Sequence, residues 1–404
     1  MSNLVSLPQP DWTNGLMKFA SGIVQGTLAN ACHALRSAPD LQLMLAYDSF
    51  SMKTMAVAAP PWEFEPQHFG VRPWSPHDDL LTAEHLQRVG VPIKPQTAAQ
   101  AVEVVARERS YHPVLDYLDS LTWDGKMRLD SWVSDYLGVT ETPYSHSVGR
   151  SALIGAVARI RQPGCKLDTV PIIEGTQGLG KSSAARVLFD PWFSDDLADL
   201  GSKDAAMQTQ GAWLIEISEL DAMSRGEVAR IKAFVSRSTD RFRPPYGARV
   251  IESPRSCVFW GTTNSDAYLK DETGGRRFWP LKAGRIDIAG LAKARDQLWA
   301  EADRLFAAGA AWWIVNPEAM RIAEGEQVAR YQGDPWDDAI SAHLKTVIDV
   351  SVEEILRDVL HLEIGRWSQT DMNRVARCLR SRGMVRSQVR TGDKRAWRYR
   401  RFGT

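Results

Sequence analysis

The chain has 404 residues, of which 44% are hydrophobic and 24% charged, as is typical of a soluble globular protein with two or three domains. No stretch approaches about 18 consecutive apolar residues, and the N-terminus lacks the basic start and apolar core of a signal peptide. We therefore expect no membrane span and a cytoplasmic location. Four widely separated cysteines without metal-ligand spacing agree with reduced thiols. The formal net charge of zero gives no general support for nucleic-acid binding.

The first 165 residues contain mainly helical patterns. Apolar residues recur at helical spacing over 15–45, and a Pro- and Trp-rich stretch follows. Caps and periodicity then predict helices at 80–89, 98–109, within 112–125, at 128–137 and at 143–161. We expect residues 1–75 to form an N-terminal region of unassigned structure and residues 76–165 to form an all-helical platform.

From residue 166 onward, strand and helix patterns alternate. Buried strands are predicted at 170–173, 213–218 and 257–264, with a further strand at 249–252 and helices at 182–189 and 224–236. This alternation predicts an α/β core over residues 166–285, with a parallel sheet covered by helices on both faces. Helices at 289–310, 317–330 and 335–347 would form a helical extension over 286–348.

The last segment, 349–404, has a different composition and pattern. Helices are predicted at 351–360 and 370–382, followed by strands at 384–390 and 396–401 that a turn connects. Two helices followed by a hairpin are typical of a winged helix, a relative of helix-turn-helix DNA-binding domains. Twelve basic residues stand against Asp371 and Asp393 between residues 365 and 404, so this winged-helix-like domain is strongly basic although the whole chain is neutral.

Residues 175–182 fit the phosphate-binding pattern G-x-x-x-x-G-K-[ST], between the first predicted strand and a helix. Glycines in such a turn let backbone N–H groups surround a phosphate, and the helix N-terminus adds partial positive charge. Lys181 would reach the β- and γ-phosphates of ATP, and the Ser182 hydroxyl would hold Mg²⁺. The predicted nucleotide-binding residues are Gly175, Thr176, Gln177, Gly178, Leu179, Gly180, Lys181, Ser182 and Ser183.

ATP hydrolysis also needs a carboxylate near the phosphates, to orient Mg²⁺ and polarise water. The second predicted strand contains Glu216 and ends at Glu219; we favour Glu219, which lies beyond the last buried residue, and keep Glu216 as the alternative. Asn264 ends the third strand and is expected to hold the attacking water beside the γ-phosphate. Farther on, Arg277 is favoured over Arg276 as an arginine finger, whose guanidinium supplies charge to the transferring phosphoryl group.

Two basic segments are candidates for nucleic-acid binding. One lies between the second and third buried strands, where arginines alternate with aromatic residues in a turn-rich loop; a solvated hairpin without a ligand is the alternative interpretation. The other is the predicted C-terminal hairpin. The candidate contacts are Arg237, Arg241, Arg243, Tyr246 and Arg249 in the loop and Arg386, Arg390, Lys394 and Arg395 in the hairpin.

As a set, these motifs resemble superfamily 3 helicases, and more closely the virulence-associated protein E family of phages, prophages and pathogenicity islands. The resemblance covers about residues 110–285. It is carried by the phosphate-binding motif, by Leu121-Thr-Trp-Asp-Gly, Trp213-Leu-Ile-Glu-Ile-Ser-Glu, Arg241-Phe-Arg-Pro-Pro-Tyr-Gly, Thr262-Thr-Asn and Gly275-Arg-Arg-Phe-Trp-Pro.

This resemblance implies an AAA+-type P-loop ATPase core in a homo-hexameric ring, in the cytoplasm of a bacterial host cell. The ring would hydrolyse ATP with Mg²⁺ at its subunit interfaces and translocate on single-stranded or forked DNA. Family members are often fused to a primase, but residues 1–110 are short and poor in clustered acidic residues. A stand-alone helicase is therefore expected, with a primase or other replication proteins as further partners.

Two other functions agree with parts of the sequence. An ATP-switched DNA-binding initiator or regulator would use the basic C-terminal domain without unwinding DNA. A P-loop kinase that acts on small molecules would use the same phosphate-binding motif. Asn264, the arginine pair at 276–277 and the two basic segments argue against the kinase.

Overall fold

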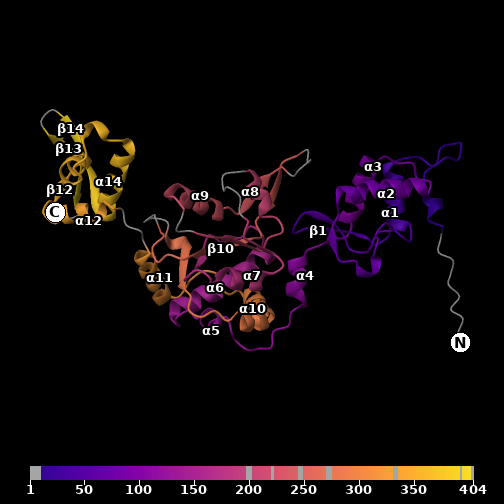
Figure 1. Ribbon diagram of the computed structural model, residues 1–404, viewed down its shortest axis with the longest axis horizontal. Helices are drawn as coiled ribbons and strands as arrows, with labels where there is room; N and C mark the ends of the chain where they lie inside the picture. Colours follow the sequence, from indigo (N-terminus) through magenta and orange to yellow (C-terminus); the bar gives the residue numbers. More distant parts are fainter. Residues whose placement is uncertain are drawn as a thin grey trace.

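The computed structural model describes residues 11–196, 203–219, 223–243, 249–269, 275–330, 335–391 and 394–401. Figure 1 shows three bodies in a row, which follow the order of the sequence: an N-terminal body, a large middle body and a small C-terminal body. Within the described residues, no helix is both long and apolar enough to cross a membrane.

The N-terminal body is a small sheet covered by helices. Its strands follow the order β3-β2-β1-β4. Helices α1, α2 and α3 share one hydrophobic core with β1, which extends from Leu16 to Ala106. The elements are η1 (Trp12–Gly15), α1 (Leu28–Ser37), β1 (Leu45–Asp48), β2 (Lys53–Ala56), η2 (Pro66–His68), β3 (Arg72–Pro73), α2 (Pro76–Arg88), α3 (Pro95–Arg107) and β4 (Ser110–Tyr111).

This core differs from the expected organisation of residues 1–165. The helical pattern over 15–45 yields a helix only at α1, and a strand follows at β1. The expected boundary at residue 75 divides a single core, because α2 and α3 pack with α1. The segment 76–165 is not all helical, since β4 pairs in parallel with β1. Strands of two to four residues are too short for period-two alternation to be recognised in the sequence.

A five-stranded parallel sheet forms the centre of the middle body. Its order is β11-β5-β10-β7-β6, and every neighbouring pair is parallel. This confirms the predicted parallel sheet. The strands are β5 (Val170–Glu174), β6 (Phe193–Ser194), β7 (Leu214–Ile217), β10 (Val258–Thr263) and β11 (Phe278–Lys282).

Helices cover both faces of this sheet, as the alternating pattern predicted (Figure 1). One core contains α6, α7 and α10 together with a cluster of aromatic rings, in which the Trp213 and Trp299 centroids are 4.2 Å apart. The opposite core includes side chains of α8 and α9. The helices of this body are α4 (Pro113–Ser120), α5 (Trp132–Leu137), α6 (Pro143–Arg161), α7 (Lys181–Phe189), α8 (Lys203–Gln208), α9 (Arg225–Val235), η3 (Gly275–Arg277), α10 (Ile288–Ala307) and α11 (Pro317–Ala329).

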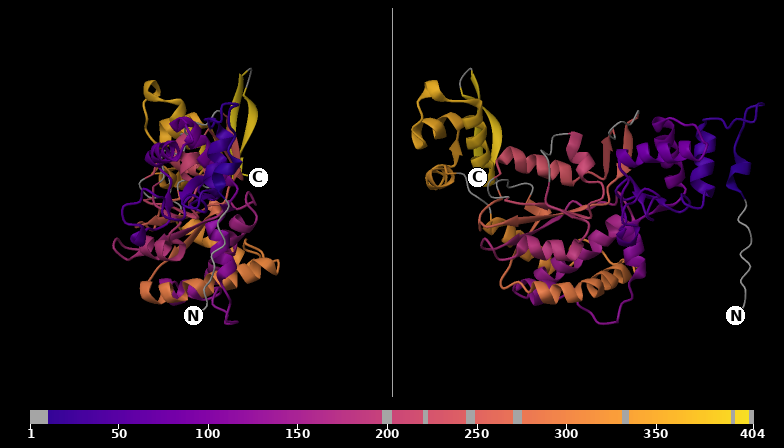
Figure 2. Two further views of the ribbon diagram at one scale, coloured as in Figure 1. Left: turned by 90° about the vertical axis from the view of Figure 1, so that its right-hand side faces the viewer. Right: turned by 45° about the vertical axis from the view of Figure 1, so that its right-hand side comes forward.

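An antiparallel hairpin, β8 (Thr239–Phe242) with β9 (Ile251–Pro254), projects from the middle body (Figure 2). A fully buried ion pair holds its base: Arg255 Nε donates to Asp240 Oδ2 at 2.8 Å and Arg255 Nη2 to Asp240 Oδ1 at 2.5 Å. The Arg255 guanidinium also lies 4.5 Å from the Phe234 ring centroid of α9. The hairpin is thereby fixed to α9 at its base.

The C-terminal body has the helix-and-hairpin pattern that the sequence predicted, but the predicted boundary at residue 349 is wrong. The helix expected at 335–347 as part of the extension 286–348 is α12, and Ile340 of α12 packs in the core of the C-terminal body. Its last helix starts at a capping box in which Ser368 and Asp371 bond reciprocally. A short third strand, β12, pairs with β14 and was not predicted. The elements are α12 (Asp337–His343), β12 (Asp349–Val350), α13 (Val352–Glu354), η4 (Ile355–Val359), η5 (Ile364–Arg366), α14 (Gln369–Ser381), β13 (Met384–Thr391) and β14 (Lys394–Arg401).

Candidate nucleotide site

The glycine-rich turn between β5 and α7 has the backbone of a phosphate cradle. Gly178 and Gly180 have φ values of 80° and 94°, a left-handed region that side chains with a Cβ rarely adopt. Gly180 is the N-cap of α7 and no side chain caps this helix. The first backbone N–H groups of α7 are therefore not bound by a cap and can serve an anion.

A pocket of about 380 Å³ opens beside this turn. Its walls come from the turn, the start of α7 and the carboxyl ends of β7 and β10, which meet at one edge of the parallel sheet. Ligands of open α/β sheets bind at this edge. The lining residues are Gln177, Gly178, Leu179, Gly180, Lys181, Ser182, Ser183, Ser218, Glu219, Thr262, Thr263 and Asn264.

The structure joins two of the sequence-predicted residues directly. Lys181 Nζ donates to the carbonyl oxygens of Gly175 at 2.6 Å and Thr176 at 2.9 Å, and to Asn264 Oδ1 at 2.9 Å. Lys181 is only 8% exposed, so its ammonium group is fixed at the base of the pocket. An amide from the end of β10 and the cation of the glycine-rich turn thus form one constellation.

A second constellation lies beside it, around the buried Glu216. Ser182 Oγ and Thr262 Oγ1 both donate to Glu216 Oε1, each at 2.6 Å. Glu216 is 2% exposed and pairs in register with Trp260 of β10. Sequence reasoning missed Thr262, although the polar run at the end of β10 contained the signal.

The two acidic candidates occupy different positions. Glu216 contacts Ser182, whereas the favoured Glu219 is exposed, lines the pocket and has a φ of 53°. The residue that bonds to the Ser182 hydroxyl is therefore Glu216, the alternative candidate. The residue whose carboxylate is exposed in the pocket is Glu219, the favoured candidate. Glu219 lines the pocket itself, whereas Glu216 is buried behind two lining residues, Ser182 and Thr262, so the two carboxylates are candidates for separate tasks.

The arginine candidates lie near the amino ends of the parallel strands, opposite the end that carries the glycine-rich turn. Register pairs Phe278, which follows Arg277, with Val170 at the start of β5, whereas the glycine-rich turn follows the end of β5. Arg277 Nε donates to Ser236 Oγ at 3.1 Å and lies 3.6 Å from Asp168 Oδ2. Arg276 is exposed. Among the described residues, neither arginine lines the pocket of its own chain.

A buried ionic network supports the residue directly before the glycine-rich turn, and the sequence did not indicate it. Arg330 Nη2 donates to Glu174 Oε2 at 2.8 Å, and the Tyr268 hydroxyl donates to Glu174 Oε1 at 2.7 Å. Burial and the neighbouring Glu174 raise the pKa of Tyr268 far above its ordinary value. Although burial opposes the shift, the bonds to Glu174 raise the pKa of Arg330. Glu174 and Arg330 are thus held as an ion pair.

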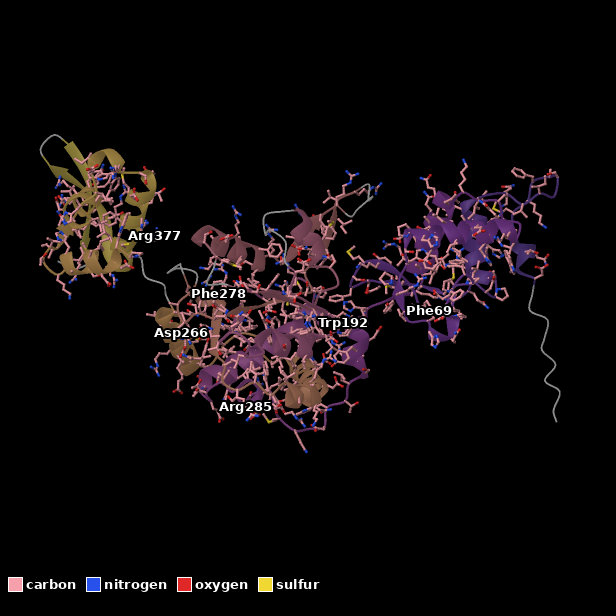
Figure 3. The ribbon with its side chains drawn as sticks, in the orientation of Figure 1. Phe69, Trp192, Asp266, Phe278, Arg285 and Arg377 are labelled. Carbon is pink, nitrogen blue, oxygen red and sulfur yellow. The ribbon has the colours of Figure 1, made fainter. Side chains whose placement is uncertain are left out.

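The predicted nucleic-acid contacts are partly described. Arg241 pairs with Glu252 across the exposed hairpin β8–β9 at 2.7 Å, and the Arg237 guanidinium lies 5.2 Å from the Phe234 ring centroid. Arg243 and Arg249 are exposed, and Arg386 lies over the Trp397 ring of the C-terminal hairpin. Tyr246 and the side chains of Arg390, Lys394 and Arg395 lie outside the described residues. Figure 3 labels another arginine of this body, Arg377, on α14.

The donor set fits Mg²⁺ bound together with a nucleotide. Among the described residues, no group of three or more His, Cys, Asp or Glu side chains could hold a metal alone. Mg²⁺ in nucleotide sites is held by one or two protein groups, phosphate oxygens and waters. The Ser182 hydroxyl beside the Glu216 carboxylate would provide such a pair of oxygen ligands.

Comparison with known proteins gives a family match and distant structural neighbours. The family model described as the virulence-associated protein E-like domain matches residues 118–332. Apo structures of the C-terminal region of NrS-1 share 14% and 11% identity, with TM-scores of 0.45 and 0.47. Each alignment covers 89% of this chain and 96% of the other. No curated protein sequence matches the chain significantly.

Proposed function

The chain belongs to the virulence-associated protein E-like family, and from this premise we propose that it is an ATP-dependent DNA helicase of phage or mobile-element replication. The observation that carries this proposal is the pocket in which Lys181 bonds to Asn264 while Ser182 bonds to Glu216. A cation, a polar amide and a buried carboxylate that meet near the carboxyl ends of the parallel strands suit nucleoside triphosphate hydrolysis. The strand order and the helices on both faces agree with an AAA+-type core of the superfamily 3 class.

Each residue of the pocket receives a role from its position. The glycine-rich turn and the start of α7 bind phosphates through backbone N–H groups, and Lys181 adds a positive charge. Ser182 and Glu216 orient Mg²⁺, which when bound neutralises phosphate charge. The exposed carboxylate of Glu219 accepts a proton from the attacking water. Asn264 orients that water, because its side chain lines the pocket and is held beside Lys181 by the bond from Nζ to Oδ1.

A homo-hexameric ring would complete the site. Arg277 lies at the opposite sheet edge from the glycine-rich turn, so it would act on the site of a neighbouring subunit. Its present partners, Ser236 and Asp168, would be exchanged for the phosphoryl group. Hairpin β8–β9 would line the central channel and contact single-stranded DNA. A primase or other replication proteins would act with the ring.

Mixing inactive subunits tests the shared site. Arg277→Ala and Lys181→Ala proteins should each be inactive in ATP hydrolysis, because each lacks one half of every site. In mixtures, some interfaces would combine an intact pocket with an intact arginine, so hydrolysis should partly return. Phosphate release is measured across mixing ratios, with Arg276→Ala as the matched control. If no mixture regains activity while both variants still form rings, the finger does not act in trans.

A second candidate is an ATP-switched DNA-binding initiator or regulator. The basic C-terminal body, whose helix-and-hairpin pattern is that of a winged helix, favours it. Such a protein would bind a forked duplex without separating its strands. Strand separation driven by ATP therefore distinguishes the helicase from the regulator, and it is the experiment that tests the proposed function.

A further inference from the structure

The C-terminal body uses part of its positive charge internally. Arg398 Nη1 and Nη2 each donate to Glu354 at 2.9 Å, and its Nε donates to Asp349. Arg400 Nε donates to Asp349 Oδ2 at 2.6 Å. Although burial opposes the shift, these bonds lower the pKa of both carboxyls. Arg398 and Arg400 are therefore matched by acidic partners on β12 and α13 and contribute little to an anion-binding surface.

The opposite face of β14 carries two aromatic residues. Side chains alternate along a strand, so Trp397 and Tyr399 face away from Arg398 and Arg400. Tyr399 is 2% exposed and belongs to the core of this body. Trp397 is two residues nearer the hairpin turn and is 49% exposed. Within the described part of the hairpin, the core contains only Met384 and Tyr399, so the rest extends beyond it (Figure 1).

Arg386 orients the exposed indole. Register pairs Arg386 with Tyr399 and Gln388 with Trp397, which places Arg386 diagonal to the indole. Its guanidinium carbon lies 4.1 Å from the Trp397 ring centroid, while Arg386 itself stays exposed. One face of the indole is therefore covered by a cation, and about half of the side chain is open.

A second arginine–tryptophan pair in the same body differs from the first, because its tryptophan packs against the core. The Arg374 guanidinium lies 3.8 Å from the Trp336 ring centroid. Trp336, however, packs against the core formed by α12, α14 and the sheet. Its ring is used in folding, whereas Trp397 stands on a projecting hairpin that carries seven basic residues in its two strands and no acidic ones.

We propose that Trp397 and Arg386 form a platform on which an unpaired base of single-stranded DNA stacks. A base offers its flat face to an aromatic ring only when it is not stacked within a duplex, and the positive charge of Arg386 attracts the adjoining phosphate. The choice of DNA rests on the proposed function, whereas the preference for an unpaired base follows from the exposed ring.

Binding of an oligothymidylate of about 20 nucleotides to the full-length protein tests this platform. Fluorescence anisotropy is measured without nucleotide, over a series of salt concentrations. Trp397→Leu, which keeps an apolar side chain, should weaken binding about tenfold at unchanged salt dependence, because it removes one stacking contact. Trp397→Phe should stay within about twofold of the wild type. Arg386→Gln should reduce the slope of log K against log salt by about one.

Arg400→Gln is the matched control, because it removes the same charge from an ion-paired arginine on the opposite face. It should leave both the affinity and the salt slope unchanged. Circular dichroism and DNA-independent ATP hydrolysis report on folding and on the pocket separately. The platform is refuted if Trp397→Leu binds the single strand as the wild type does, or if it loses affinity for a blunt duplex equally. If the wild-type protein binds the single strand through Trp397 but hydrolyses no ATP, the proposed function is refuted and the platform is not.

Discussion

Glu219→Gln is expected to lower kcat for ATP hydrolysis by about 100-fold while ATP binding is kept. Glu219 is exposed in the pocket and, in our proposal, takes a proton from the attacking water. Glutamine keeps the size of the side chain but cannot accept that proton. Glu216→Gln should act differently, because Glu216 contacts the Ser182 hydroxyl and is buried. We expect it to raise the Mg²⁺ concentration needed for half-maximal activity.

Steady-state kinetics at several Mg²⁺ concentrations separates these effects, with binding of a fluorescent ATP analogue as the control for affinity. Thr262→Val is a useful companion, since it removes one of the two hydroxyl donors to Glu216 without changing a charge. It should shift the Mg²⁺ dependence in the same direction as Glu216→Gln. The assignment is contradicted if Glu219→Gln hydrolyses ATP at the wild-type rate.

Arg255→Ala is expected to lower the free energy of unfolding of the middle body by about 3–5 kcal/mol, because it leaves Asp240 buried without its partner. Urea unfolding followed by tryptophan fluorescence measures this change. Arg241→Ala is the matched control in the same hairpin. Its ion pair with Glu252 is largely exposed, at 72% and 61%, so its loss should cost about 0–1 kcal/mol. Equal losses for the two variants would show that the buried pair does not hold the hairpin.

The sequence predicted the parts of the fold that depend on local patterns. The glycine-rich turn, the buried strands β5, β7 and β10 and the helices α7 and α9 lie close to their expected positions, because each has its own short signal. The small N-terminal sheet was missed, since strands such as β3 and β4 contain only two residues. Such strands exist through tertiary pairing and leave no periodicity.

In the candidate site, too, local patterns predicted some contacts and not others. The meeting of Lys181 with Asn264 was foreseeable, because both belong to the carboxyl edge of a parallel sheet. The choice between Glu216 and Glu219 depends on which side chain faces Ser182, and a strand pattern does not supply that. The ion pair of Glu174 with Arg330 joins residues 156 positions apart. In the C-terminal body, a count of basic residues includes Arg398, whose charge is matched by Glu354.

The most direct test of the account is strand separation of a forked DNA duplex by the full-length protein with ATP and Mg²⁺. Separation is followed by fluorescence as the labelled strand leaves, with phosphate release recorded in parallel. We predict that the wild type separates the strands and hydrolyses ATP faster when DNA is present, and that Lys181→Ala binds the fork but does neither. A wild-type protein that binds the fork and hydrolyses ATP without separating its strands would contradict the helicase and favour the regulator.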